Sequence, residues 1–280
     1  MHPFLRQGLI LSLSMLMAAC ASTTGGGAIG VHRKQFLLVS SAEVDAAALQ
    51  AYQGELGEAT KAGKLNTDKA TLERVRGIAD RLIPQTAVFR PDALQWQWEV
   101  NLETNPELNA YCAPGGKIMF FSGIISKLSL TDDEIAAIMG HEMAHALREH
   151  GRERMSQAMA QQFGVQLGSE LLGIQDQVQL AQMGAQLLYG LPNSREQESE
   201  ADVIGLELMA RAGYNPNAAV SLWHKMEQAG AGNGPAWLST HPSGPQRINE
   251  LQSRIPAVLP LYQQARANLP AVVPKVVPRH

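Results

Sequence analysis

The chain has 280 residues, of which 18% are charged, and a formal net charge of −3 at pH 7. This length allows one sizeable hydrophobic core together with an N-terminal extension. The small net charge and the lack of a basic stripe interleaved with aromatic residues argue against a nucleic-acid partner.

The first twenty residues have the features of a targeting segment. Arg6 supplies a positive charge, residues 8–17 are largely apolar, and Cys20 follows shortly afterwards. Because the apolar stretch is too short to cross a bilayer as a helix, it favours a signal peptide over a membrane anchor. The pattern resembles a bacterial lipoprotein signal, and the alternative is a plain secretory signal in which Cys20 is incidental.

The lipoprotein resemblance implies a domain plan and a location. We expect a signal peptide over residues 1–19, and a flexible tether over residues 20–34 that begins at a lipidated Cys20. Ala21 in place of Asp after that cysteine implies sorting to the outer membrane, with the protein on its periplasmic face. One domain over residues 35–255 and a Pro-rich tail over residues 256–280 follow.

Helices and two short strands are predicted ahead of the central motif. Helices are expected over residues 41–62, where Ser40 and Glu43 form a capping box, and over residues 68–83. Strands are expected over residues 95–102 and 117–121. The fold class is therefore α+β and mainly helical, with a small sheet or hairpin packed beside the helix of residues 131–150.

The segment between the two predicted strands is a candidate substrate strand with its turn. An edge strand beside a catalytic metal can receive an extended peptide by β-augmentation, and a hairpin turn without a substrate role is the alternative. Cys112 has no adjacent base, which argues for packing rather than catalysis. The candidate residues of the substrate strand are Asn109, Ala110, Tyr111, Cys112, Ala113, Gly115 and Gly116.

Residues 141–145 form an HExxH motif within a capped, largely apolar helix. His141 and His145 lie four residues apart and so share one helix face, where both imidazoles can bind one ion. Imidazole nitrogen suits zinc, and Glu142 lies where a general base can take a proton from the attacking water. The motif predicts one Zn²⁺ per chain with catalytic Glu142.

A second helix, over residues 193–213, offers further ligands. Asn193 and Glu196 are expected to cap it, and Glu198 and Asp202 share one of its faces. Because a catalytic zinc takes a third protein ligand, Glu198 is the predicted ligand and Asp202 the acceptor behind a ligating histidine. Glu200, on another face, is expected to be a solvated carboxylate, although it is the rival to Glu198.

Three further histidines are interpreted from their context. His150 is expected to be packed or exposed away from the metal, and His224 to be exposed. His241 is a candidate oxyanion stabiliser, or a fourth zinc ligand that keeps an enzyme idle. Residues 152–190 are expected to form packing helices, with a covering or partner-binding role as the alternative.

The combination of HEMAH, ESEAD, THPSGPQRI and NAYCAPGGKI resembles the zinc metallopeptidase family of HtpX and the CAAX prenyl protease. Within it, the chain is similar to the periplasmic lipoprotein branch of the LoiP and BepA type, which acts in outer-membrane protein quality control. The resemblance implies a gluzincin fold with zinc held by His141, His145 and Glu198. It also implies that His241 and Arg247 lie near the substrate.

Two functions follow as expectations. The first is a zinc endopeptidase of the cell envelope that cleaves unfolded or misfolded envelope proteins and is tied to the membrane by the lipid on Cys20. The second is a latent or chaperone-like factor of the outer-membrane assembly machinery, with its zinc site held inactive by His241.

Overall fold

The computed structural model describes residues 20–166, 192–230, 236–241 and 244–269. The elements in chain order are β1 (Cys20–Ala21), β2 (Gln35–Phe36), α2 (Ser41–Lys61), α3 (Lys69–Leu82), η1 (Ile83–Val88), η2 (Pro91–Gln95), β3 (Glu99–Glu103), β4 (Ala110–Ala113), β5 (Lys117–Phe121), α4 (Ser122–Lys127), α5 (Asp132–Leu147), α6 (His150–Gln166), α8 (Arg195–Arg211), α9 (Asn217–Ala229), α10 (Ala236–Thr240) and α11 (Pro245–Asn268). Within these ranges, no helix combines the length and the apolar character needed to span a membrane. The predicted signal peptide lies outside the described residues.

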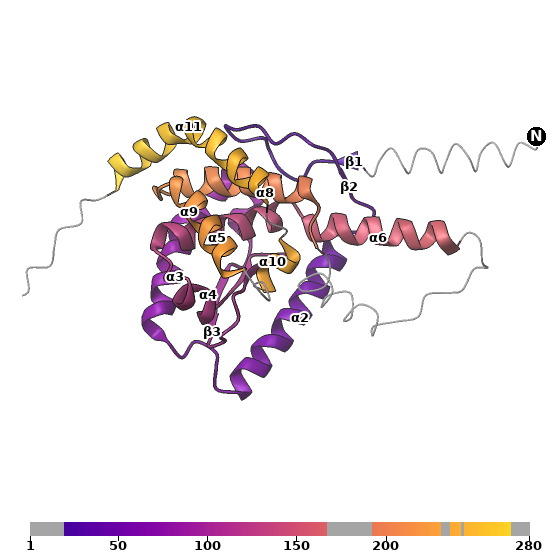
Figure 1. Cartoon of the computed structure of the whole chain (residues 1–280). Helices are drawn as coiled ribbons and strands as arrows, with labels where there is room; N and C mark the ends of the chain where they lie inside the picture. The colour runs from indigo at the N-terminus through magenta and orange to yellow at the C-terminus, as the bar shows by residue number, and fades with distance from the viewer. Residues whose placement is uncertain (1–19, 167–191, 231–235, 242–243, 270–280) are drawn as a thin grey trace, which may run out of the picture.

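The helix that carries the HExxH motif is the centre of the molecule (Figure 1). α5 packs against α3, α8, α9 and strand β4. The three-stranded sheet has the order β3-β5-β4, with β3 parallel and β4 antiparallel to β5, so that β4 is an edge strand beside α5. The predicted mainly helical fold with a small sheet next to this helix is confirmed.

α5 begins as its sequence predicts. The Thr131 hydroxyl accepts the amide N–H of Glu134, and the Glu134 carboxylate accepts the amide of Thr131, which completes a capping box. Every residue from Glu134 to Leu147 is buried. Since the helix is enclosed on all sides, its histidines must find polar partners or a ligand.

Two glycines allow α5 and α8 to approach closely. A Cβ atom on Gly205 would lie 2.7 Å from the backbone nitrogen of His141 and 2.9 Å from the carbonyl carbon of Gly140. These are backbone atoms in the middle of a helix and cannot move aside cheaply. The crossing at Gly140 and Gly205 therefore sets the distance from α8 to the histidines of α5.

Gly205→Ala is expected to lower the free energy of unfolding by about 1–3 kcal/mol, because the added methyl group overpacks this helix crossing. Gly77→Ala, in a helical position with open space around it, is the matched control and should be neutral or stabilising. Urea unfolding followed by circular dichroism measures both. Equal stability of Gly205→Ala and wild type would show that the crossing is not tight.

The segment of residues 20–34 is packed onto the domain, so the prediction of a flexible tether is wrong. β1 pairs with β2, and the amides of Ala28 and Ile29 donate to the Glu207 carboxylate of α8. Arg33 pairs with Glu153 and Glu200. Charged side chains on α6 and α8, distant in the sequence, hold this strap (residues 20–36) in place.

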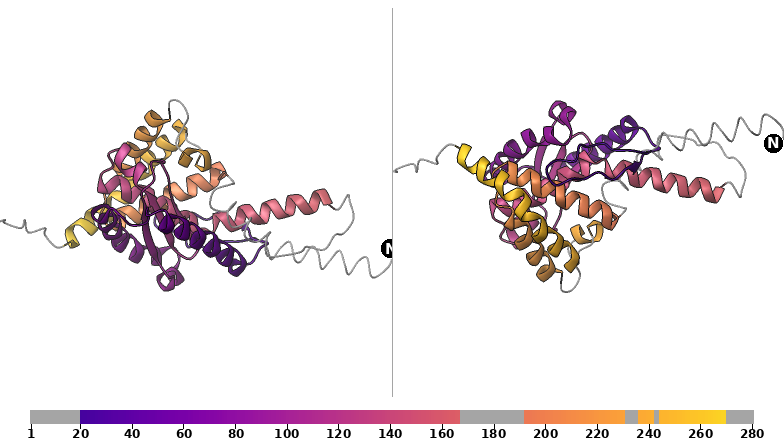
Figure 2. Two further views of the ribbon diagram at one scale, coloured as in Figure 1. Left: turned by 90° about the horizontal axis from the view of Figure 1, so that it is seen from below. Right: turned by 90° about the horizontal axis from the view of Figure 1, so that it is seen from above.

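The C-terminal boundary also differs from the prediction. α11 continues through Pro256 and Pro260 to Asn268, so residues 256–268 are helical rather than part of a tail. Val258 is fully buried, and its apolar contacts offset part of the cost of two prolines within a helix. Residues 270–280 lie outside the described residues. Figure 2 shows α11 lying across the domain and α6 projecting from it.

Smaller differences concern two element boundaries. β3 begins at Glu99 rather than at residue 95, because Trp96 and Trp98 pack against each other with tilted rings and the Trp98 indole donates to the Ala93 carbonyl. The capping box of α8 is formed by Ser194 and Gln197, one residue beyond the predicted pair. Most of the predicted packing segment of residues 152–190 lies outside the described residues, and its first part is α6.

Candidate metal centre

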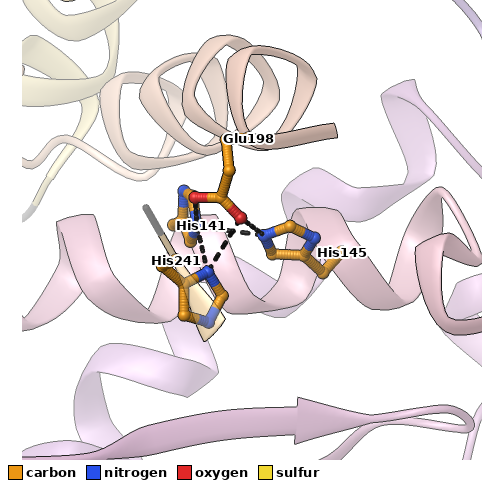
Figure 3. A group of neighbouring side chains, drawn as sticks. All are labelled: His141, His145, Glu198 and His241. Atoms are coloured by element: carbon orange, nitrogen blue, oxygen red, sulfur yellow. Dashed lines mark hydrogen bonds and ion pairs between the residues drawn. The ribbon is translucent and has the colours of Figure 1, made fainter. Parts of the chain in front are cut away.

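Four buried side chains direct one ligand atom each at a common point (Figure 3). His141 and His145 come from α5, Glu198 comes from α8, and His241 follows α10. Their ligand atoms all lie within 4.8 Å of one another. The structure thus brings together the two histidines and the glutamate predicted as ligands, and it adds His241 to them.

The distances between these atoms fit a tetrahedral ion. Ligand atoms 2.0–2.1 Å from a tetrahedral Zn²⁺ lie roughly 3.3–3.4 Å from one another. His145 Nε2 is 3.0 Å from His141 Nε2 and 3.3 Å from Glu198 Oε1. His241 Nδ1 is 3.2 Å from His141 Nε2 and 3.0 Å from Glu198 Oε1. The donor set of three imidazoles and one carboxylate also suits zinc.

Asp202 orients the first of these histidines. His141 Nδ1 donates to Asp202 Oδ1 over 2.9 Å, which leaves the lone pair of Nε2 directed at the common point. Burial disfavours charge on His141, but hydrogen bonds from its ring to Asp202 and Glu198 and their negative charges raise its pKa to about 9. The pocket therefore attracts positive charge at the place where a cation would bind.

Arg247 lies behind the carboxylates rather than among the residues that line the cleft. Its guanidinium donates to both oxygens of Asp202 over 2.7 Å, pairs with Glu198 and stacks on Trp223. Its position near the substrate, which the resemblance implied, stays a prediction. One guanidinium faces two buried carboxylates here, so with neutral imidazoles the group carries a negative charge that a cation would neutralise.

The predicted base is held by an indole that the sequence did not single out. Trp237, on α10, is 1% exposed and donates from Nε1 to Glu142 Oε1 over 2.7 Å. Its ring stacks on that of His241, with centroids 4.7 Å apart. His241 Nε2 is 3.4 Å from the same oxygen of Glu142. α10 and the residue after it therefore place Trp237 against the base and His241 in the ligand group, which consists of His141, His145, Glu198 and His241.

A cavity of about 760 Å³ opens beside this group. Its walls include strand β4, helix α2 and the end of α10, and Glu142, His145 and His241 line it. Among the predicted substrate-strand residues, those that line it are Asn109, Ala110, Tyr111 and Cys112; Ala113 ends β4, and the turn follows at Gly115 and Gly116, both at positive φ. Burial raises the pKa of the Cys112 thiol, which fits a packed cysteine.

Glu200 was misjudged from the sequence, whereas His150 and His224 agree with their expectations. Glu200 is buried rather than solvated, and it contacts Arg33, Arg148 and His150. Burial alone would raise its pKa, but hydrogen bonds from His150 and Arg33 and the charge of Arg148 lower it to about 2. His150 is fully buried, so it is packed as one of its two expected alternatives states, and it contacts His145 at Nδ1, on the side away from the ligand atoms. His224 is exposed, as expected.

The HExxH helix, the glutamate on a following helix and the small edge-stranded sheet define a gluzincin-type metallopeptidase fold. The model of Peptidase family M48 matches residues 69–255, more than half of the chain. The chain belongs to this family. The resemblance drawn from the sequence is thereby confirmed at the level of a metallopeptidase family.

Relatives with curated names extend this finding. The chain is 37% identical over 162 residues to the mitochondrial metalloendopeptidase OMA1 of Schizosaccharomyces pombe, covering 57% of this chain and 47% of the relative. It is 35% identical over 173 residues to that of Arabidopsis thaliana, covering 61% and 34%. Metalloprotease LoiP of Escherichia coli is 27% identical over 154 residues, covering 54% and 60%.

The chain spans about half or less of the length of these two OMA1 relatives. The similarity to LoiP agrees in part with the branch that the sequence suggested, while the OMA1 proteins are more similar in sequence.

Proposed function

We propose that the protein is a zinc-dependent endopeptidase that cleaves unfolded or misfolded proteins of the cell envelope. The observation that carries the catalytic part is the cluster of His141, His145 and Glu198 beside Glu142, at the wall of a cavity bounded by an edge strand. Family M48 and relatives named metalloendopeptidases support the same reaction.

Glu142 acts as the general base. It lies between the two histidines in the sequence and lines the cavity, so its carboxylate can take a proton from an attacking water and return it to the leaving amine. Trp237 holds Oε1 of this carboxylate, which fixes its orientation. Bound at His141, His145 and Glu198, a zinc ion would polarise the scissile carbonyl and increase the acidity of the water.

Removal of the metal tests the proposal. Chelation is expected to abolish cleavage of an unfolded model protein, and one equivalent of zinc should restore it, because the buried ligands fit a tetrahedral ion. Product release is followed by gel electrophoresis, with a serine-protease inhibitor as the control for contamination. Cleavage that survives complete removal of metal would overturn the assignment.

The edge strand β4 supplies the substrate-binding backbone. The amide of Phe121 donates to the Asn109 carbonyl, and β4 pairs antiparallel with β5, so Asn109, Tyr111 and Ala113 direct their backbone groups at β5. Ala110 and Cys112 then direct theirs at the open edge, where the Asn109 side chain already accepts from the amide of Ala110. The amide of Cys112 is thus available to an extended peptide.

Cys112→Pro is expected to lower kcat/KM for a peptide by about 2- to 10-fold, since one backbone hydrogen bond to the substrate is lost. Cys112→Ala keeps the amide and should cleave at nearly the wild-type rate, because the thiol has no part in the reaction. Initial rates on a fluorogenic peptide, with circular dichroism to verify the fold, measure both. Equal rates for the two variants would contradict binding at this edge.

The location and the partners are also part of the proposal. The lipoprotein-like segment before Cys20 and the similarity to LoiP support a lipid anchor on Cys20 at the periplasmic face of the outer membrane. Substrates at this place are unfolded or misfolded envelope proteins, whose extended segments can pair with β4. Metabolic labelling with a palmitate analogue, with Cys20→Ala as the control, tests the anchor.

A second candidate function is favoured by His241. Its Nδ1 completes the ligand group, so that four protein atoms surround the point where the ion would bind. A catalytic zinc site keeps one position open, whereas a closed set of four is typical of structural sites. A latent or chaperone-like factor of the outer-membrane assembly machinery would retain this closed arrangement.

A further inference from the structure

The second ligating histidine is supported by a chain of buried hydrogen bonds that leads away from the candidate metal centre. His145 Nδ1 lies 2.8 Å from His150 Nδ1, and His150 Nε2 lies 3.0 Å from Glu200 Oε2. His150 is fully buried, and Glu200 is 8% exposed. These contacts join α5, α6 and α8 on the side of His145 that faces away from the ligand group.

The positions of the protons give this series of hydrogen bonds a single donor-to-acceptor direction. A neutral imidazole has one N–H donor and one acceptor nitrogen, and a ligating nitrogen must keep its lone pair. With Nε2 of His145 in the ligand group, its proton is on Nδ1 and is donated to Nδ1 of His150. The proton of His150 is then on Nε2, from which it is donated to the carboxylate of Glu200.

Two guanidinium groups hold Glu200, the last acceptor in this series of hydrogen bonds. Arg148, which is fully buried, donates to Glu200 from Nε and Nη2 over 3.1–3.2 Å. Arg33, from the strap of residues 20–36, donates to both oxygens of Glu200 over 2.9 and 3.0 Å. Glu200 is therefore held as an ionised acceptor, and the strap contributes to the support of a metal ligand.

We propose that His150 and Glu200 are positioning residues of the metal centre, which fix the tautomer and the ring orientation of His145. This inference rests on the proposed zinc site. It gives His145 a support equivalent to the one that Asp202 gives His141, with a second imidazole inserted between the ligand and the carboxylate. Loss of such support usually weakens metal binding by about 10- to 100-fold.

A pair of variants of nearly equal size tests the role of His150. His150→Leu removes the acceptor for His145, whereas the new amide side chain of His150→Asn would place an oxygen near the position of Nδ1. We expect His150→Leu to raise the Kd for zinc by about 10- to 100-fold and His150→Asn to bind at least about tenfold more tightly than His150→Leu. Competition with a chromogenic chelator measures Kd, and thermal unfolding of the metal-free proteins reports their folding.

The tautomers of the wild-type protein give a second readout that needs no folded variant. In zinc-loaded protein labelled with ¹⁵N-histidine, NMR should show the proton of His145 on Nδ1 and that of His150 on Nε2. A proton on Nδ1 of His150, or folded His150→Leu with the zinc affinity of wild type, would overturn the inference. Wild-type protein that does not bind zinc would overturn the proposed function as well, which separates the two failures.

Discussion

Replacing Glu142 with Gln is expected to lower kcat for peptide cleavage by about 10²- to 10⁴-fold, while zinc binding remains. The amide has nearly the shape of the carboxylate and can still accept from the Trp237 indole, so the fold of the site is kept. It has no basic oxygen that can take a proton from water. Because Glu142 is absent from the ligand group of His141, His145, Glu198 and His241, the affinity for zinc should change little.

The measurement pairs cleavage of an unfolded model protein with the zinc content of the same sample. Glu227→Gln, which makes the same chemical change on α9 at a partly exposed position, is the matched control and should cleave like wild type. Native-rate cleavage by Glu142→Gln would remove Glu142 from the mechanism. Loss of zinc together with loss of activity would show that its carboxylate serves the metal instead.

The groupings that the sequence predicted and the structure reproduces are those set by local geometry. The cap at Thr131 and the spacing of His141 and His145 depend only on neighbours within one helix. Glu198 and Asp202 follow from the same spacing rule on α8, once the histidines demand a third ligand. Each of these inferences needs only a predicted helix and the spacing of residues along it, and both are visible in the sequence.

The residues that it missed are linked by contacts between distant segments. Trp237 reaches Glu142 across 95 positions, and Glu200 reaches His150 across 50. The helical spacing predicts that Glu200 and Glu198 lie on different faces of α8. It does not predict that a histidine and two arginines contact the face that carries Glu200. The strap is a second example of contacts that the sequence does not reveal. Its glycine-rich sequence suggests flexibility, whereas in the structure Glu207 and Glu200 bind it.

His241 is the residue on which the two candidate functions diverge. In the closed arrangement its Nδ1 occupies the fourth place among the ligand atoms, and its ring stacks on the indole that holds Glu142. The carbonyl of Thr240, next to it, accepts from both the backbone and the side chain of Asn193, which ties the end of α10 to the start of α8. If this arrangement closes the site, a substrate carbonyl could reach an ion held there once this histidine has moved away.

His241→Ala is therefore expected to raise the rate of cleavage by about tenfold or more. A protein that exchanges between two such states typically populates the minor one at about 0.1–10%, so removing the closing ligand frees the rest of the molecules. His224→Ala, an exposed histidine on α9, should leave the rate unchanged. The double variant with Glu142→Gln should be inactive, because the released activity uses the same base.

The opposite result is equally decisive. If His241 instead donated to the oxyanion of the tetrahedral intermediate, its loss would lower kcat by about 10²- to 10³-fold. The two roles differ in sign, so initial rates at saturating peptide distinguish them even where the stability of the variant falls slightly. A rise in the cleavage rate would show that His241, held by α10, inhibits proteolysis until a substrate displaces it. The closed structure would then be the resting state of an active peptidase.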